Sequence, residues 1–76
     1  MKEEEADTRV AEIVSRLKAR RESLGMSLSR LSELAGMSHV GILQIESGER
    51  SPQLRTIIKL AAALDLKLAK LFSGLD

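Results

Sequence analysis

The chain has 76 residues, with 12 Lys and Arg against 11 Asp and Glu, no cysteine and one aromatic residue, Phe72. This length allows one domain with a small core, and the cysteine count excludes disulfides and thiolate metal sites. A single aromatic residue is too few for base stacking on single-stranded nucleic acid. No apolar run approaches the roughly 20 residues that cross a bilayer, and no signal-peptide pattern is present. We therefore expect a cytoplasmic protein with no membrane partner.

Charge is distributed unevenly along the chain. Residues 1–7 carry one lysine against four acidic residues, a net charge of −3, whereas the remainder carries eleven basic against seven acidic residues, a net charge of +4. We expect residues 1–7 to form an acidic flexible leader and residues 8–76 to form a single, moderately basic domain.

The first two predicted helices each show apolar residues at spacings of three and four, followed by a glycine. The first ends at Gly25, and its inner face consists of Val10, Ile13, Val14, Leu17, Arg21 and Leu24. The second begins after Ser27, whose hydroxyl can cap it, and ends at Gly36. Its apolar positions are Leu28, Leu31, Leu34 and Ala35.

Three further helices complete the prediction. Ser38 caps the third, which has Ile42 and Ile45 on its inner face and ends at Gly48. A fourth helix is expected over residues 54–64, and Pro52 suits its first turn. It packs through Leu54, Ile57, Ala61 and Leu64. A short fifth helix contains Leu68, Leu71 and Phe72. Since strand-type alternation is absent, we predict an all-α fold of five short helices.

Two charged residues lie on helix faces that are otherwise apolar. Arg21 comes four residues after Leu17 in the first helix, and Glu46 comes four residues after Ile42 in the third. A charge is costly to bury alone, whereas a guanidinium and a carboxylate can satisfy each other. We therefore predict a structural ion pair between Arg21 and Glu46. Arg20 is the alternative partner, and exposure of both charges to solvent is the other possibility.

The stretch from Met26 to Gly48 has the pattern of a helix-turn-helix, at about residues 27–47. Together with its flanking helices it resembles the phage-repressor, Cro and Xre-type helix-turn-helix family over residues 16–72. The matching positions are Leu17, Arg21, Leu24-Gly25, Leu31, Ala35 to Ser38, Ile42, Ile45 to Gly48, Pro52, Leu54, Leu60 to Leu64, Leu68 and Leu71-Phe72. The resemblance implies a lambda-repressor-like domain that binds operator DNA as a two-fold dimer. It also places the family's arginine–glutamate bridge on Arg21 and Glu46.

In this geometry the third helix enters the major groove, and we expect base reading by His39, Val40, Leu43 and Gln44. Gln44 matches a base-reading position of the family, and its amide can bond N6 and N7 of adenine. Val40 and Leu43 offer apolar contact to thymine methyl groups. His39 can reach a phosphate or a guanine acceptor. Ordinary solvated side chains are the alternative for Gln44 and His39.

Contacts to the DNA backbone are expected near helix N-termini and in the loop before the fourth helix. The candidates are Ser27, Ser38, Ser47, Arg50 and Arg55. Capping is the alternative role of the first two, and a solvated charge is the alternative for the two arginines. A further group of basic residues is not decisive, because arginines are common on helix surfaces: Arg16, Lys18, Arg20, Arg21 and Arg30.

The chain departs from the family pattern at its reading surface. Leu28 stands where many members have a glutamine at the first residue of the second helix, and the third helix has no lysine or arginine. We expect Leu28, Val40 and Leu43 to form an apolar surface. Such a surface fits recognition of thymine methyl groups, weak affinity for an isolated half-site, or binding of a protein.

The C-terminal residues offer more apolar surface than a small monomer can hide, so we place a homodimer contact there. The residues are Leu66, Leu68, Leu71, Phe72 and Leu75. Closing the core is their alternative role, which we expect for Leu68 and Leu71.

We predict a sequence-specific, double-stranded DNA-binding transcriptional regulator of the repressor type. As a homodimer it would bind a near-palindromic operator with its reading helices about 34 Å apart. The alternative is a protein-interaction module of the same fold, such as an antitoxin-like domain. An enzyme is not expected, since there is one histidine and no Gly-rich phosphate loop or metal-ligand cluster. No catalytic residue, metal, cofactor or small-molecule site is predicted.

Overall fold

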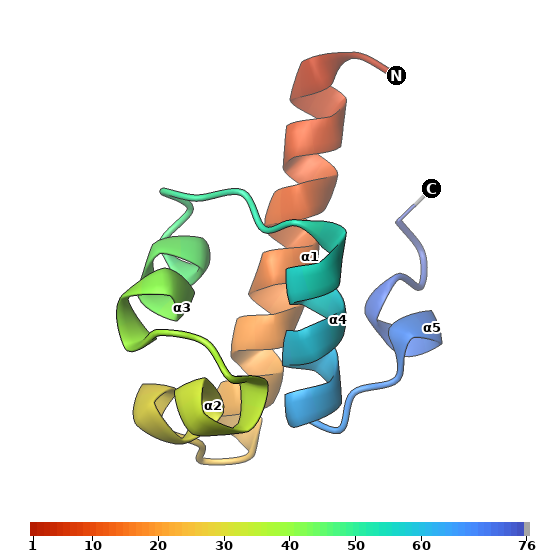
Figure 1. Cartoon of the computed structure of the whole chain (residues 1–76). Helices are drawn as coiled ribbons and strands as arrows, with labels where there is room; N and C mark the ends of the chain where they lie inside the picture. Colours follow the sequence, from red (N-terminus) through yellow and green to blue (C-terminus); the bar gives the residue numbers. More distant parts are fainter. Residues whose placement is uncertain (76) are drawn as a thin grey trace.

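A computed structural model describes residues 1–75 and contains five helices in the predicted order. They are α1 (Glu3–Ser23), α2 (Leu28–Ala35), α3 (His39–Glu46), α4 (Leu54–Ala63) and α5 (Leu68–Leu71). Figure 1 shows α3 and α5 on opposite sides of a centre formed by α1 and α4. The described residues contain no strand, so the prediction of an all-α fold is confirmed. Within residues 1–75 no helix is long and apolar enough to cross a membrane.

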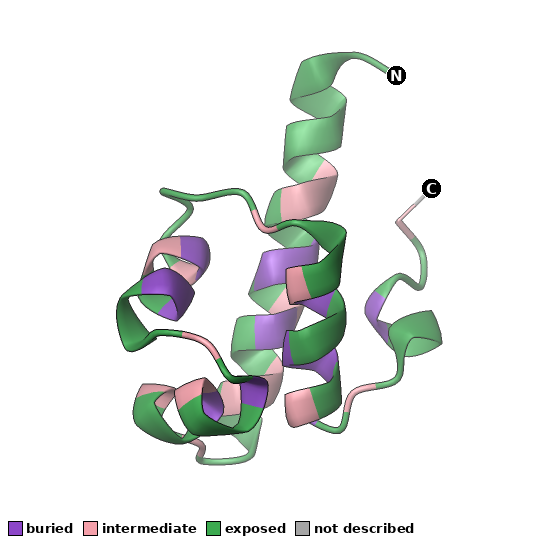
Figure 2. Ribbon diagram, in the orientation of Figure 1, coloured by how far each residue is buried: buried purple, intermediate pink, exposed green. Residues whose placement is uncertain are grey.

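Every helix contributes to one hydrophobic core. Figure 2 shows the buried residues on the sides of the helices that face the interior. Burying a leucine or isoleucine side chain stabilises the fold by about 1.5–3 kcal/mol, so these contacts hold short helices that would be marginal alone. The core consists of Ile13, Leu17, Leu31, Ala35, Ile42, Ile57, Leu60, Ala61, Leu64 and Leu71.

Four leucines that the apolar pattern assigned to the core are exposed instead: Leu24, Leu34, Leu54 and Leu68. Leu24 is the C-cap of α1, whereas Leu54 and Leu68 are the first residues of α4 and α5. At these three helix ends the side chain projects beyond the neighbouring helices, so its periodic position does not bury it. Leu34 lies at the edge of the buried stripe of α2, which is formed by Leu31 and Ala35.

Two helix starts differ from the prediction. α1 begins at Glu3, so residues 3–7 continue this helix and no element boundary separates them from the domain. The acidic side chains in its first turn explain the helical start, because carboxylates interact favourably with the positive end of a helix. The flexibility of residues 1–7 stays a prediction. Pro52 precedes Gln53, the N-cap of α4, and lies outside the helix that it was expected to begin.

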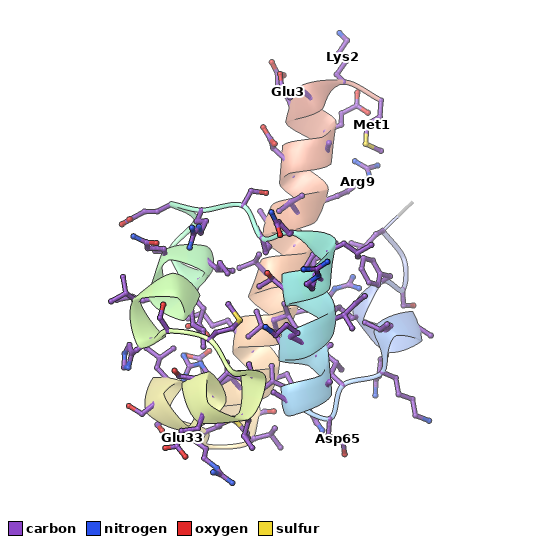
Figure 3. All side chains as sticks on the ribbon, in the orientation of Figure 1. Met1, Lys2, Glu3, Arg9, Glu33 and Asp65 are labelled. Atoms are coloured by element: carbon purple, nitrogen blue, oxygen red, sulfur yellow. The ribbon has the colours of Figure 1, made fainter. Side chains whose placement is uncertain are left out.

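Arginines of α1 donate hydrogen bonds to main-chain carbonyls of residues 64–75, the segment that begins at the end of α4. Arg20 donates from Nε to the carbonyl of Leu64 at 3.0 Å and from Nη2 to the carbonyl of Asp65 at 3.3 Å. Arg9, labelled in Figure 3, donates from Nε to the carbonyl of Leu75 at 2.8 Å. The last carbonyls of a helix lack partners inside it and carry partial negative charge. Arg20 therefore stabilises the C-terminal end of α4.

Arg16 has the same role at the end of α5. Its Nη1 donates to the carbonyl of Leu71 at 2.9 Å and to that of Ser73 at 2.6 Å, while its Nε contacts Glu12 at 3.1 Å. A four-residue helix has too few internal hydrogen bonds to be stable by itself. The guanidinium of Arg16 and the burial of Leu71 together hold α5 against α1.

We expect Arg16→Ala to lower the free energy of unfolding by about 1–2 kcal/mol, because two carbonyls lose a charged donor. The measurement is urea denaturation followed by circular dichroism. Lys18→Ala is the matched control, since Lys18 is an exposed cation on α1 with no hydrogen bond shown within residues 1–75. Equal effects of the two substitutions would contradict this role of Arg16.

Candidate nucleic-acid interface

The segment from Ser27 to Ser47 forms two capped helices joined by a left-handed glycine. The side chain of Ser27 accepts a hydrogen bond from the backbone N–H of Arg30 at 3.0 Å, and that of Ser38 accepts one from Gly41 at 2.9 Å. Between them Gly36 ends α2 at φ 64° and ψ 39°, a conformation that costs glycine little. These signals start α2, stop it, and start α3 as the sequence predicts.

Gly41 is a residue whose importance sequence analysis missed. It is buried in the first turn of α3, and a Cβ atom added to it would lie 2.9 Å from the Oγ atom of Ser38. A larger residue would therefore push against the hydroxyl that caps α3. The added Cβ atom would also lie 3.9 Å from Nη1 of Arg50, so this guanidinium lies beside the first turn of α3. A glycine three residues after a capping serine is the signal that would have identified this position.

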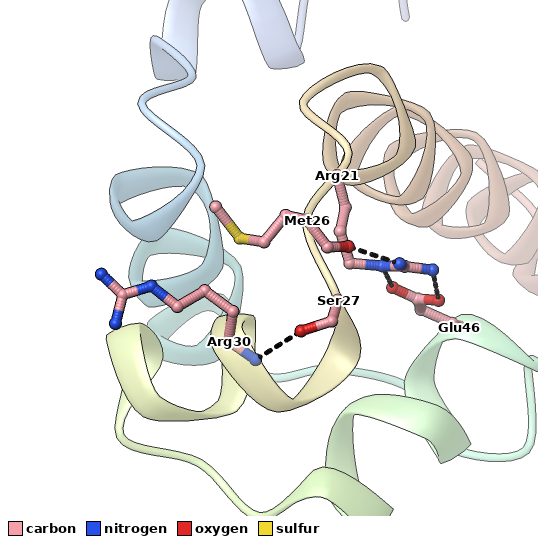
Figure 4. A network of polar contacts seen from close by, with 5 residues as sticks. All are labelled: Arg21, Met26, Ser27, Arg30 and Glu46. Atoms are coloured by element: carbon pink, nitrogen blue, oxygen red, sulfur yellow. Dashed lines mark hydrogen bonds and ion pairs between the residues drawn. The ribbon is translucent and has the colours of Figure 1, made fainter.

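Arg21 and Glu46 meet in a bidentate ion pair, shown in Figure 4. Nε and Nη2 of Arg21 donate to the two carboxylate oxygens of Glu46 at 2.8 and 2.9 Å. The remaining Nη1 donates to the carbonyl of Met26 at 2.9 Å. The two side chains are 13% and 10% exposed. The pair therefore joins the end of α1, the α1–α2 loop and the end of α3.

The hydrogen bond to Glu46 raises the pKa of Arg21 above its usual value, while burial acts in the opposite direction. The negative charges of Glu46 and Glu22 raise this pKa further. The pKa of Arg21 is higher in the folded chain than in the unfolded chain. The ion pair therefore contributes its full stabilisation of the fold at a pH below the usual arginine pKa. On the alkaline side this stabilisation is lost only as the pH rises through the raised value.

The predicted base-reading residues share α3 but differ in exposure. Val40 and Leu43 are 60% and 49% exposed. His39 is also exposed, and its Nδ1 atom lies 3.5 Å from Oγ of Ser29 on α2. Gln44 is half-buried. The exposed face of α3 is therefore centred on two apolar side chains, with a histidine at its N-terminal end.

Leu28 is less exposed than Val40 and Leu43. It is half-buried and packs against the hydrophobic core, whereas its neighbour Ser29 lies beside His39 of α3. The expectation that Leu28 joins Val40 and Leu43 therefore stays a prediction, and the exposed apolar side chains of α3 itself are Val40 and Leu43.

The predicted backbone-contacting residues are distributed around α3. The hydroxyl of Ser47 donates to the carbonyl of Gln44 at 3.1 Å, as part of the turn that follows α3. Arg50 and Arg55 are exposed, the first in the loop after α3 and the second in the first turn of α4. The structure shows no ion pair of either arginine within residues 1–75. The two capping serines, described above, are exposed as well.

A groove of about 770 Å³ lies between the middle of α1, residues 7–18, and the end of α3 with the loop that follows it. Its lining mixes apolar side chains with charges of both signs, among them Val10, Lys18, Glu49 and Arg50. Within residues 1–75 no buried side-chain polar atom lacks a partner, and no group of three His, Cys, Asp or Glu could hold a metal. The groove therefore presents no defined ligand chemistry.

The residues expected at a dimer contact separate into two groups. Leu71 is buried, and Leu66 and Leu75 are half-buried against the core. Leu71 offers no surface for such a contact, because α1 and α4 cover it, and it takes the alternative role expected for it, closing the core. Leu68 and Phe72 are exposed.

Two further exposed apolar residues, Leu54 and Ile58, lie on α4, which contacts α5. Sequence analysis assigned the first to the core and did not consider the second. Their spacing of four residues places them on one face of α4. That face becomes a candidate surface only once the fold shows that no other helix covers it. With Leu68 and Phe72 they form what we call the α4–α5 apolar surface.

We expect Glu46→Ala to lower the free energy of unfolding by about 3 kcal/mol, because it leaves the guanidinium of Arg21 buried without a carboxylate. The double variant Arg21→Met/Glu46→Leu should be more stable than Glu46→Ala, since it buries no unpaired charge. Thermal and urea denaturation measure both. Glu12→Ala removes an exposed ion pair and should change the stability by less than about 1 kcal/mol. A Glu46→Ala effect as small as that of Glu12→Ala would contradict the structural role of the pair.

Comparisons with known proteins agree with this geometry. The family model for the helix-turn-helix matches residues 17–71. An HTH-type transcriptional regulator of Haemophilus influenzae is 38% identical over 65 residues, which are 86% of this chain and 65% of that protein. The HTH-type transcriptional regulator SutR of Escherichia coli is 40% identical over 57 residues, 75% of this chain and 32% of SutR. The chain thus spans about two thirds of the first protein and one third of the second.

Among solved structures, the restriction-modification controller protein C.AhdI from Aeromonas hydrophila superimposes with a TM-score of 0.75. The match has 33% sequence identity and covers 83% of this chain and 96% of the controller protein. The likeness therefore extends beyond the two central helices to most of both chains.

Proposed function

Because the chain belongs to the helix-turn-helix family of the Cro/C1 type, we propose that it binds specific double-stranded operator DNA and regulates transcription as a homodimer of the repressor type. As a regulator that acts on DNA, the protein is proposed to work in the cytoplasm. The observation that carries the proposal is the presentation of α3: its inner face and C-terminal end are anchored, while no other helix of residues 1–75 covers its outer face.

The proposed docking places α3 in the major groove and α2 across the DNA backbone. Ile42 and Ile45 bury the inner face of α3, and the Glu46 ion pair anchors its last turn. Gln44 lies between the inner and outer faces, and its backbone carbonyl accepts hydrogen bonds from Arg50 N and Ser47 Oγ. A helix held in this way can place the Gln44 amide and the His39 ring against base edges with little freedom.

Phosphate contacts are proposed for Arg50 and Arg55, which form no ion pair within residues 1–75. The guanidinium of Arg50 lies beside the first turn of α3, and Arg55 is in the first turn of α4. Both positions add a full positive charge to the partial positive charge of a helix start, which favours an anion. The hydroxyls of Ser27 and Ser38 accept from backbone N–H groups and still have a proton to donate to phosphate oxygen.

The homodimer is proposed to form through the α4–α5 apolar surface. In Figure 1, α5 lies on the other side of the molecule from α3, with α4 between them, so a second copy bound against α5 does not cover α3. Exposed leucine, isoleucine and phenylalanine side chains on adjoining helices are typical of an interface core. A two-fold axis through this surface would present two α3 helices to successive turns of a palindromic site.

The exposed apolar pair Val40 and Leu43 also supports a second candidate function, a protein-interaction module of the same fold. This candidate predicts binding to a protein and no salt-dependent affinity for duplex DNA.

Selection from random duplex DNA should yield a near-palindromic sequence, with affinity falling steeply as salt rises.

Arg55→Gln should reduce the slope of log K against log salt by about one and weaken all sequences alike. Gln44→Ala should weaken the selected sequence by about tenfold or more and leave non-specific binding unchanged. Lys70→Gln on α5, remote from α3 in Figure 1, is the charge-matched control. Absence of salt-dependent duplex binding by the unmodified chain would reject the proposed function.

Sedimentation equilibrium tests the dimer. Phe72→Asn should raise the dimer dissociation constant by about tenfold or more, because it places an amide in an apolar contact. Leu24→Asn is the control, as Leu24 is an exposed leucine outside α4 and α5. A chain that is monomeric when bound to its selected palindrome, or equal effects of both variants, would reject this interface.

A further inference from the structure

The exposed face of α3 differs from an ordinary DNA-reading surface in its chemistry. Val40 and Leu43 stand three residues apart and therefore lie next to each other on the helix, with 60% and 49% of their surfaces exposed. The one charged residue of α3 is Glu46, which is engaged by Arg21. The centre of this face therefore has no hydrogen-bonding group of its own.

An apolar side chain in the major groove discriminates between bases because it cannot form hydrogen bonds with their edges. The edges of the bases offer N7, O6, O4 and amino groups, and covering these without a hydrogen bond costs free energy. The C5 atom of a pyrimidine is different, because it carries a methyl group in thymine and in 5-methylcytosine but a hydrogen in cytosine and uracil. Contact between this methyl group and Val40 or Leu43 removes apolar surface from water on both sides.

The position of the pair is tightly defined. Ser38 caps the first turn of α3, Ile42 and Ile45 bury its inner face, and the Arg21–Glu46 pair holds its end. Arg50 in the following loop and Arg55 in the first turn of α4 form no ion pair within residues 1–75, and Glu49 stands beside Arg50 in the same loop. The net positive charge of these three residues favours a polyanion over an apolar protein partner for the same face.

We propose that Val40 and Leu43 form a reader of pyrimidine C5-methyl groups, so that the operator affinity depends on thymine methyls and increases when cytosine at the same position is 5-methylated. This inference rests on the proposed DNA binding. It extends that function by a response to a covalent modification of the DNA.

The experiment uses the selected duplex and replaces each thymine of a half-site singly by uracil, which keeps every hydrogen-bonding group. At one or two positions the dissociation constant should rise about threefold to fivefold per methyl group lost. At those positions, a 5-methylcytosine–guanine pair should bind more tightly than cytosine–guanine by a similar factor. Fluorescence anisotropy at constant salt measures all of these complexes.

Substitutions of Val40 and Leu43 test whether these two side chains cause the preference for thymine over uracil. In Val40→Ala or Leu43→Ala the ratio of uracil to thymine dissociation constants should fall toward one at the affected position. Both residues are exposed, so the fold should persist, which circular dichroism checks. Leu34→Ala is the matched control, because Leu34 is 45% exposed and lies on α2; this variant should retain the full ratio.

Each other outcome is decisive. A selected half-site without thymine, equal binding of uracil and thymine duplexes, or a ratio unchanged in both α3 variants would overturn methyl reading and leave the proposed DNA binding intact. Equal binding of cytosine and 5-methylcytosine duplexes would overturn the response to methylation. If the unmodified chain shows no salt-dependent duplex binding, the proposed function itself fails, and this inference fails with it.

Discussion

The ion pair between Arg21 and Glu46 is the interaction on which the placement of α3 depends. It joins residues 25 positions apart in the chain, and the same guanidinium also holds the carbonyl of Met26, where the chain turns from α1 into α2. An eight-residue helix has little stability of its own. A pair of nearly buried charges tolerates few geometries, since each is costly without the other. It therefore defines where α3 ends relative to α1, and with that the direction of the exposed face.

Arginine has separate roles on the two sides of this molecule. On α1, Arg9, Arg16 and Arg20 donate to main-chain carbonyls of residues 64–75 and act as structural caps. Beyond α3, Arg50 and Arg55 have no such partners within residues 1–75. The net charge of the chain therefore says little about its affinity for an anion. What matters is which guanidinium groups remain free once the helix ends have been satisfied.

The positions at which prediction from sequence succeeded share a physical basis. The caps at Ser27 and Ser38 and the stop at Gly36 depend on groups within a few residues of each other, so local sequence contains all the information that they need. Arg21 and Glu46 could be paired because a charge on an apolar face demands a partner, and few candidates exist. Most of the misassigned core residues lie at helix ends, as Leu24 and Leu54 do, where periodicity continues but the covering helix does not.

The sequence by itself determined the five helices, most of the residues that face the core, and the chemistry of the α3 surface, because these follow from spacing and side-chain type along one element. The tertiary structure alone decided that Leu28 is half-buried, that Ile58 is exposed, and that the arginines of α1 reach the ends of α4 and α5. The reason is that exposure and the partners of a long side chain depend on which other helix lies opposite. That is a property of packing between distant segments, which no local pattern contains.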